Sequence, residues 1–253
     1  MSVFIEAAHS GKVAKLALWE LGTNYNAPHL SGAWGLIVKS RQAVEGLWSM
    51  ASTIEADDRR SDSAKADDIR AQRLQRASEI GKLQRQLIGL RANHEAAKRK
   101  LSAVAPYTAE DGAAMAILDV EIARQVTAME PSKRAALVQF GHDQRTVDAL
   151  LRVPPIISGL TPEQVSSLTE IAVARRHPDQ ARELAEQGLA LDRAESAVRR
   201  AFEVTADGLS LDERVSAAGG DAGLIRHVRP ETVERIHDRL QAEDEAQADD
   251  ADA

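Results

Sequence analysis

Seven histidines are the residues of this chain best suited to metal binding or to proton transfer near neutral pH. They lie at His9, His29, His94, His142, His177, His227 and His237. None of them has the spacing of a metal-binding motif such as HExxH. Two are followed by an aspartate, but adjacent residues on a helix point in different directions. The sequence therefore predicts no catalytic histidine and no metal site.

Two glycine-containing segments invite comparison with nucleotide-binding loops. Ser10-Gly11-Lys12 lacks the upstream glycine and the following Ser or Thr of a phosphate-binding loop. Residues 219–223 follow a predicted helix, whereas a dinucleotide-binding loop follows a strand. We interpret both segments as turns. The chain has no cysteine, which excludes thiol catalysis and Cys-based zinc sites. We therefore expect a protein that is not an enzyme and that binds no cofactor.

A strongly basic segment is the one charge pattern that stands out. Between Ile69 and Leu101 there are nine basic residues and only two acidic ones, Glu79 and Glu95. The chain as a whole has a net charge of −7. Such a surface can bind nucleic acid or an acidic protein. The alternative is a solvated helix face, partly neutralised by the acidic stretches 55–68 and 243–253. The candidate partner-binding residues of this segment are Arg70, Lys82, Arg85, Arg91, Lys98, Arg99 and Lys100.

Aromatic side chains are concentrated near the N-terminus. Five of the eight are Phe4, Trp19, Tyr25, Trp34 and Trp48. They can form a local core, or an interface, because Trp and Tyr are favoured at the centres of protein contacts. We take Trp19 and Trp34 as the candidate interface residues. The surrounding residues 1–35 are predicted to form a helix over 3–21 that ends at Gly22, followed by a loop rich in turn-forming residues.

The basic segment lies within a long stretch without proline, residues 36–105. Steps of four and three from Ile69 to Val104 meet apolar residues except at Arg73, Arg76 and His94. The same register extends back to Ile37 across a polar stretch over 55–65. This spacing is typical of a coiled coil. Two architectures remain open: one helix roughly 100 Å long, or a hairpin that turns within 57–68. We expect self-association through the apolar seam, whereas a hairpin that closes the seam on itself would leave the chain monomeric.

The rest of the chain, residues 106–242, is predicted to be a bundle of shorter helices. The clearest helix starts are the capping sequences at Thr161 and Ser210. Residues 153–160 should be an extended, buried connector, because they hold two prolines and a glycine. The acidic residues 243–253 lack apolar anchors, and we expect disorder there.

Composition agrees with this all-α fold class, a long coiled-coil hairpin or helix followed by shorter helices. Alanine, leucine, glutamate, lysine and arginine make up close to half of the chain, which is typical of long helices. We predict no signal peptide, and no run of apolar residues is long enough to cross a membrane. Partners are therefore expected in solution rather than in a membrane.

Residues 135–178 resemble a group of uncharacterised helical proteins of tailed phages and prophages. The shared features are a leucine-rich short helix, a proline-containing connector, a Ser-Gly-Leu motif and a helix that ends at RRHP. The resemblance implies a phage context, in the host cytoplasm or the virion. We therefore predict an oligomerising structural or assembly protein. The alternative is a nucleic-acid-associated or regulatory binding module that uses the basic helix.

Overall fold

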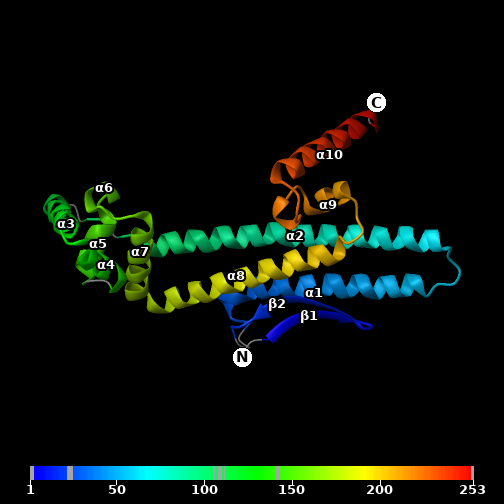
Figure 1. Ribbon diagram of the computed structural model, residues 1–253, viewed down its shortest axis with the longest axis horizontal. Helices are drawn as coiled ribbons and strands as arrows, with labels where there is room; N and C mark the ends of the chain where they lie inside the picture. The colour runs from blue at the N-terminus through cyan, green and yellow to red at the C-terminus, as the bar shows by residue number, and fades with distance from the viewer. Residues whose placement is uncertain are drawn as a thin grey trace. The chain divides into compact units, whose positions relative to one another are not determined.

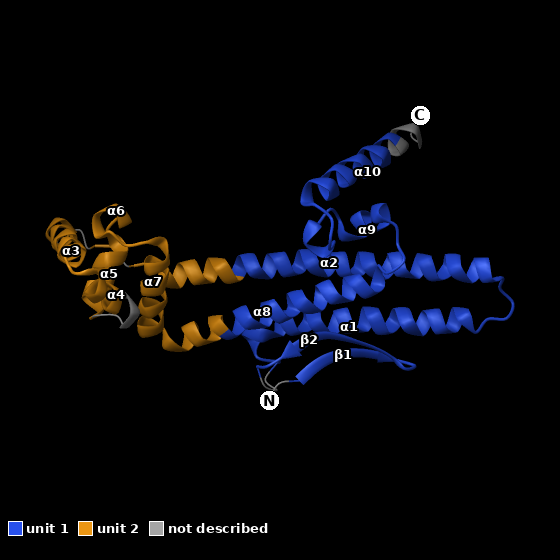
Figure 2. Ribbon diagram, viewed as in Figure 1, with its two compact units in different colours: residues 1–93, 186–253 blue, residues 94–185 orange. Residues whose placement is uncertain are grey.

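The computed structural model describes residues 3–21, 25–104, 106–107, 110, 112–140 and 143–251, with the side chains of 138–140 and 247–251 left out. Most of the described chain is helical, and a small antiparallel sheet of two strands stands at its N-terminal end (Figure 1). Contacts divide the chain into two compact units (Figure 2). Unit 1 holds residues 1–93 and 186–253, and unit 2 holds residues 94–185. The all-α expectation is right for most of the chain and wrong for its first strands.

Residues 3–19 form a β-hairpin rather than the predicted helix over 3–21. Strand β1, Val3–His9, pairs with β2, Lys12–Trp19, so that His9 lies opposite Lys12. The connecting Ser10 and Gly11 have φ angles of 46° and 82°. Two successive residues with positive φ are what a tight two-residue hairpin needs, and glycine supplies one without strain. The turn expected at this Ser-Gly pair is confirmed, but it joins strands.

Two long helices follow the hairpin. Helix α1 is Pro28–Glu55 and α2 is Asp62–Ser102. The short connection between them rules out one continuous helix over 36–105. Helix α1 begins inside the segment expected to be a loop, with Pro28 in its first turn, where the missing N–H is harmless. Residues 22–24 of that segment lie outside the described residues.

The apolar seam of α1 and α2 faces the interior of unit 1. Ile37 and Val44 on α1, and Ile80 and Leu87 on α2, are almost completely buried. A third helix, α8 (Pro178–Thr205), supplies the other side of this core. Its buried residues include Ala190, Leu191, Ala194, Ala197, Val198, Ala201 and Phe202.

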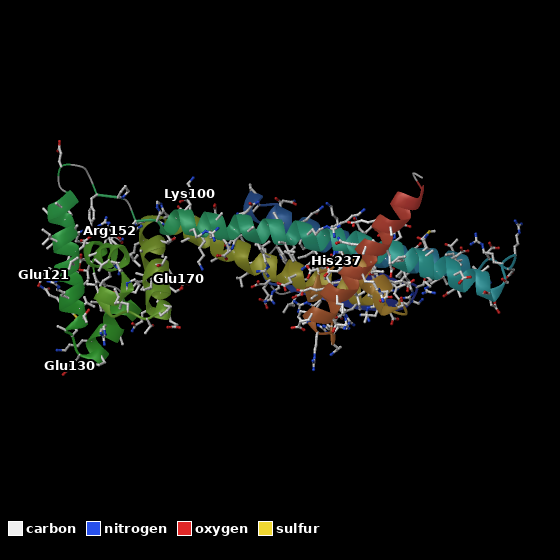
Figure 3. The ribbon with its side chains drawn as sticks, turned by 90° about the horizontal axis from the view of Figure 1, so that it is seen from above. Lys100, Glu121, Glu130, Arg152, Glu170 and His237 are labelled. Carbon is white, nitrogen blue, oxygen red and sulfur yellow. The ribbon has the colours of Figure 1, made fainter. Side chains whose placement is uncertain are left out.

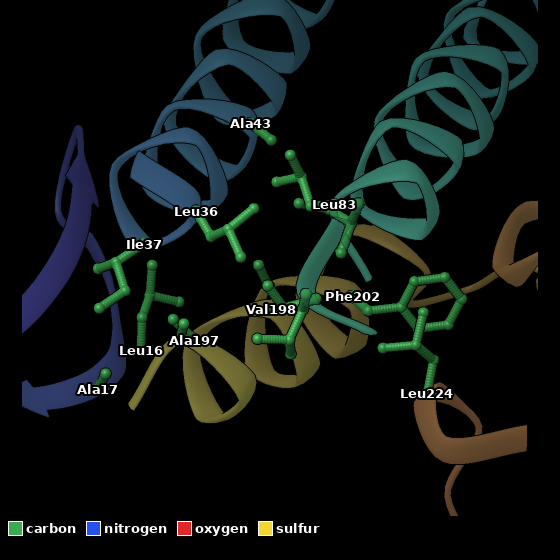
Figure 4. Packing of buried hydrophobic residues seen from close by; sticks show 14 of the residues in the cluster. Leu16, Ala17, Leu36, Ile37, Ala43, Leu83, Ala197, Val198, Phe202 and Leu224 are labelled. Atoms are coloured by element: carbon green, nitrogen blue, oxygen red, sulfur yellow. The ribbon is translucent and has the colours of Figure 1, made fainter. Parts of the chain in front are cut away.

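The apolar seam of α1 and α2 packs against helix α8. Figure 4 shows Val198 of α8 near Leu36 of α1 and Leu83 of α2, and all three belong to one buried cluster. A two-helix coiled coil is therefore not confirmed, because the seam packs on a third helix of the same chain. The central residues of the seam are buried within the chain, so self-association through the seam stays a prediction only for its exposed parts.

Three further elements complete unit 1. They are α9 (Leu211–Ala218), the 3-10 helix η1 (Ala222–Leu224) and α10 (Pro230–Ala251). Leu224 is buried beside Phe202 (Figure 4). Helix α10 continues through most of the acidic stretch predicted to be disordered. Alanine, glutamate and glutamine are good helix formers, so a helix anchored at Val233 can extend without apolar contacts.

Unit 2 is built from short helices. They are α3 (Gly112–Thr127), α4 (Pro131–Phe140), α5 (Gln144–Arg152), α6 (Pro155–Ser158) and α7 (Pro162–Arg176). The capping box predicted at Thr161 is present, as is the one at Ser210 in unit 1. The connector 153–160 contains the one-turn helix α6, and its Ile156 is 92% exposed, so a fully buried, extended connector is wrong.

The predicted single bundle over 106–242 is also wrong. Its first part forms unit 2, and residues from Glu186 onward complete the core of unit 1 with α1 and α2. No helix within the described residues is both long and apolar enough to cross a membrane.

Candidate interaction surface

A groove runs between α1 and α2 in unit 1. Its wider section has a volume of about 510 Å³. The floor contains Leu36, which is buried, and Leu90, which is half-buried. The walls are lined by Ser31, Gly32, Gly35, Lys39, Gln86, Gly89 and Asn93. The groove therefore has an apolar floor and unusually low walls.

Two of these glycines are not required by the packing of this chain. An added Cβ at Gly35 or Gly89 would meet no atom within 4 Å, whereas one at Gly32 would lie 3.3 Å from the Leu90 side chain. Glycine inside a helix costs about 0.5–1 kcal/mol relative to alanine. Because nothing in the described chain crowds Gly35 or Gly89, their effect is to keep the groove open.

A narrower section continues the groove along the same two helices. It has a volume of about 260 Å³ and lies over Ala43 and Leu83. The guanidinium of Arg76 donates to Glu79 at 2.8 Å on its α2 side, which neutralises both charges. Lys39 lines both sections of the groove and is exposed.

Lys82 adds a second positive charge to the rim. It lies on the same face of α2 as Gln86, because the two are four residues apart. It is exposed. Within the described part of the chain, neither Lys39 nor Lys82 forms an ion pair. The groove therefore carries an excess of positive charge.

Several residues of the predicted basic surface are paired within unit 1. Arg70 forms two hydrogen bonds of 2.9 Å with the carboxylate of Glu213 on α9. Arg91 donates to Asp192 at 2.9 Å and also contacts Glu195, both on α8. The carboxylates that accept these hydrogen bonds thus come from α8 and α9. Arg70 and Arg91 bind other parts of their own chain.

The remaining predicted basic residues lie on α2 and are divided between the two units. Lys82 and Arg85 belong to unit 1, whereas Lys98, Arg99 and Lys100 belong to unit 2. All five are exposed. Figure 3 shows Lys100 directed outward from α2. The last three residues form a short basic cluster at the end of that helix.

The N-terminal aromatic residues form a local core. Trp19 is only 3% exposed, and its ring centre lies 5.0 Å from that of Trp34 in an edge-on arrangement. Tyr25 stacks on Trp34 with the ring centres 4.4 Å apart. Offset stacked and edge-on pairs are the favourable geometries for aromatic rings. These rings therefore contact each other, and Trp19 is not available as an interface residue.

The histidines that have defined contacts have structural roles. His29 of α1 lies 2.9 Å from a carboxylate oxygen of Glu186 on α8. In unit 2, His94 Nε2 lies 3.0 Å from the carbonyl oxygen of Leu184. His142 lies outside the described residues. Among the residues that are described, no group of histidines and carboxylates is placed to hold a metal ion.

A buried ionic cluster in unit 2 was not predicted. Asp119 on α3 is completely buried and contacts Arg145 and Arg152 of α5. The hydroxyl of Tyr107 donates to the same carboxylate. Burial raises the pKa of Tyr107, and the hydrogen bond to Asp119 raises it further.

The cluster holds helices of unit 2 together. Figure 3 shows Arg152 among the helices of the unit, whereas Glu121 and Glu130 lie at its edge. Asp119 shares a helix face with Ala123 and Val126, four and seven residues on, which are also buried. A carboxylate on this apolar face was the sequence signal for the cluster.

Comparison with family models, with curated proteins and with solved structures found no match to this chain.

Proposed function

We propose that the protein is a non-enzymatic structural or assembly protein that associates with itself through unit 1. The observation that carries the proposal is the groove between α1 and α2. The two helices cover α8 from one side and leave an open channel between them, with Leu36 and Leu90 at its base. A groove between two helices is a common binding site for a further helix.

Gly35 and Gly89 favour the hypothesis that the groove binds a protein segment rather than a small molecule. Gly35 and Gly89 reduce helix propensity and leave open space where any other residue would place a side chain. Helix axes approach more closely when the side chains at the contact are small. The groove is long and open along the two helices, which suits an elongated partner.

The phage context of the proposal rests on the sequence resemblance of residues 135–178. A virion component or an assembly factor acts by repeated contacts between copies or with neighbouring proteins. Self-association is therefore the property to measure first.

Absolute molar mass, measured by light scattering after size exclusion, tests the proposal. The chain has a mass of 27.4 kDa. We expect a defined multiple of this mass at micromolar concentration and a shift toward the monomer on dilution. A monomer at every concentration up to the solubility limit would contradict the proposal.

A second candidate function is nucleic-acid binding by Lys98, Arg99 and Lys100. The observation that favours it is the exposure of all three side chains at the end of α2. Binding of a labelled DNA duplex at two salt concentrations tests it, because phosphate contacts weaken steeply with salt. The triple glutamine variant at these positions is the control and should lose binding. Absence of binding by the unmodified protein at low salt would exclude this function.

A further inference from the structure

The C-terminal end of α10 extends beyond the core of unit 1, and the one ion pair of its described side chains joins Glu243 to Arg239 of the same helix. The first part of α10 is held by Val233, which is completely buried, and by Ile236 and Leu240, which pack against the core of unit 1. After Leu240 the described side chains, residues 241–246, are all exposed. Figure 1 shows this end of α10 directed away from α2. We call residues 241–251 the arm.

From the groove and the arm together, we propose that the groove between α1 and α2 receives the arm of a second copy of this chain. The inference rests on the proposed function, because it names the segment through which the copies associate.

Charge is the first argument for this pairing. The arm contains five carboxylates and no basic residue; these are Glu243, Asp244, Glu245, Asp249 and Asp250. Lys39 lines the groove on α1, and the exposed Lys82 shares the α2 face of the lining residue Gln86. The one acidic lining residue, Glu79, is paired with Arg76. A positive channel and a negative helix attract each other and fix which segments meet.

Side-chain size is the second argument. Four of the eleven arm residues are alanines, and the arm holds no larger apolar residue. Such a helix buries apolar area only if its backbone comes close to the surface it contacts. Gly32, Gly35 and Gly89 permit that approach, because their Cα atoms form the walls where other residues would place side chains.

Length is the third argument. At 1.5 Å per residue the arm is about 16 Å long, and the wall from Gly32 to Gln42 is about 15 Å long. The arm of the same chain points away from its own groove (Figure 1). Exchange of two arms between two copies fills both grooves and gives a closed, symmetric dimer.

Charge reversal in the full-length chain tests the inference. The groove variant is Lys39→Glu with Lys82→Glu, and the arm variant is Glu245→Lys with Asp249→Lys. Lys39, Lys82 and Glu245 are exposed, so both variants should keep the helical content and Trp fluorescence of the parent chain. We expect each variant alone to associate about tenfold or more weakly, because like charges then face each other.

Mixing the two variants is the decisive step. In the mixed dimer, each groove meets an arm of opposite charge, so association should return to about the strength of the parent chain although each variant alone associates weakly. The variant Gly35→Gln with Gly89→Gln fills the groove without changing charge and should also weaken association. If the unmodified chain associates and none of these changes alters its molar mass, the arm-in-groove contact is wrong and the proposed function stands. A monomeric unmodified chain overturns both.

Discussion

The two units of this chain differ in where the ion pairs between their helices lie: at the surface in unit 1, and largely buried in unit 2. Unit 1 has an apolar core rich in alanine, and its ion pairs, such as Arg70–Glu213 and Arg91–Asp192, lie at the rim. Unit 2 has a charge at its centre, where Asp119 is completely buried against two arginines. Long helices can fill a core with small side chains along their length. The short helices of unit 2 bury less, and an ionic cluster joins them.

This difference sets how each unit should respond to substitution. An ion pair at the surface is worth about 0–1 kcal/mol, because water already solvates both partners. Breaking a buried pair costs about 3–5 kcal/mol, because the remaining charge stays buried without its partner. Unit 1 should therefore be sensitive to changes in shape and unit 2 to changes in charge.

The largest expected effect is that of Asp119→Ala. It leaves Arg145 and Arg152 without their carboxylate and removes the acceptor of the Tyr107 hydroxyl. We expect unit 2 to lose about 3–5 kcal/mol of stability. All three tryptophans lie in unit 1. Urea unfolding should therefore show an early loss of helical circular dichroism while the tryptophan fluorescence transition stays in place.

Asp192→Ala is the matched control in unit 1. Asp192 also binds an arginine, but its side chain is 59% exposed. The stability of unit 1 should fall by less than about 1 kcal/mol. If Asp119→Ala and Asp192→Ala lower the free energy of unfolding equally, the proposed difference between buried and surface ion pairs in the two units is wrong.

Gly81→Ala tests the sensitivity of unit 1 to shape. The added Cβ would overlap the backbone carbonyl oxygen of Ala217 on α9. Helix propensity favours alanine, but α9 must shift to admit it. We expect a net loss of about 1–3 kcal/mol, as for other overpacked contacts. The midpoint of tryptophan fluorescence in urea measures it, and unchanged or increased stability would show that α9 is not packed tightly on α2.

Gly89→Ala, two turns further along the same helix, should have the opposite sign. No atom lies within 4 Å of the added Cβ, so only the gain in helix propensity remains. We expect stabilisation by about 0.5–1 kcal/mol in dilute solution, where the chain is monomeric. The same urea experiment measures it. Destabilisation would mean that a contact of this chain fills the groove.

Local signals predicted two helix starts correctly. Thr161 and Ser210 each form the expected capping box, and Asp143 caps α5 by accepting a hydrogen bond from the Thr146 N–H. The seam of α1 and α2 was also placed on the correct face. These features depend on residues three or four apart, so they can be predicted from a short stretch of sequence.

The features that were missed depend on distant residues or on weak local preference. The partner of the seam is α8, more than 90 residues after α2 begins, and periodicity does not identify a partner. The β-hairpin is rich in alanine, which hides the alternation of buried Ala14 and Leu16 with exposed Val13 and Lys15. The Ser10-Gly11 turn was the one clear signal for it.

The smallest expected effect concerns the ion pair between α2 and α9. The two hydrogen bonds from Arg70, together with the backbone N–H of Ser210, lower the pKa of Glu213 from 4.5 to about 2. A lowered pKa means that the folded state favours the carboxylate. Its contribution to stability is therefore complete above pH 4.5 and is lost as the pH falls toward 2.

Glu213→Gln isolates this contribution. The free energy of unfolding of the parent chain minus that of the variant should be positive at pH 6 and should shrink between pH 4.5 and pH 2. Glu234→Gln, at an exposed position of α10, is the control and should show no such change. A difference that stays constant over this range would mean that Glu213 stabilises α9 through the Ser210 capping box and that its charge is not needed. The surface ion pairs of unit 1 would then fix the positions of helices more than they stabilise the fold.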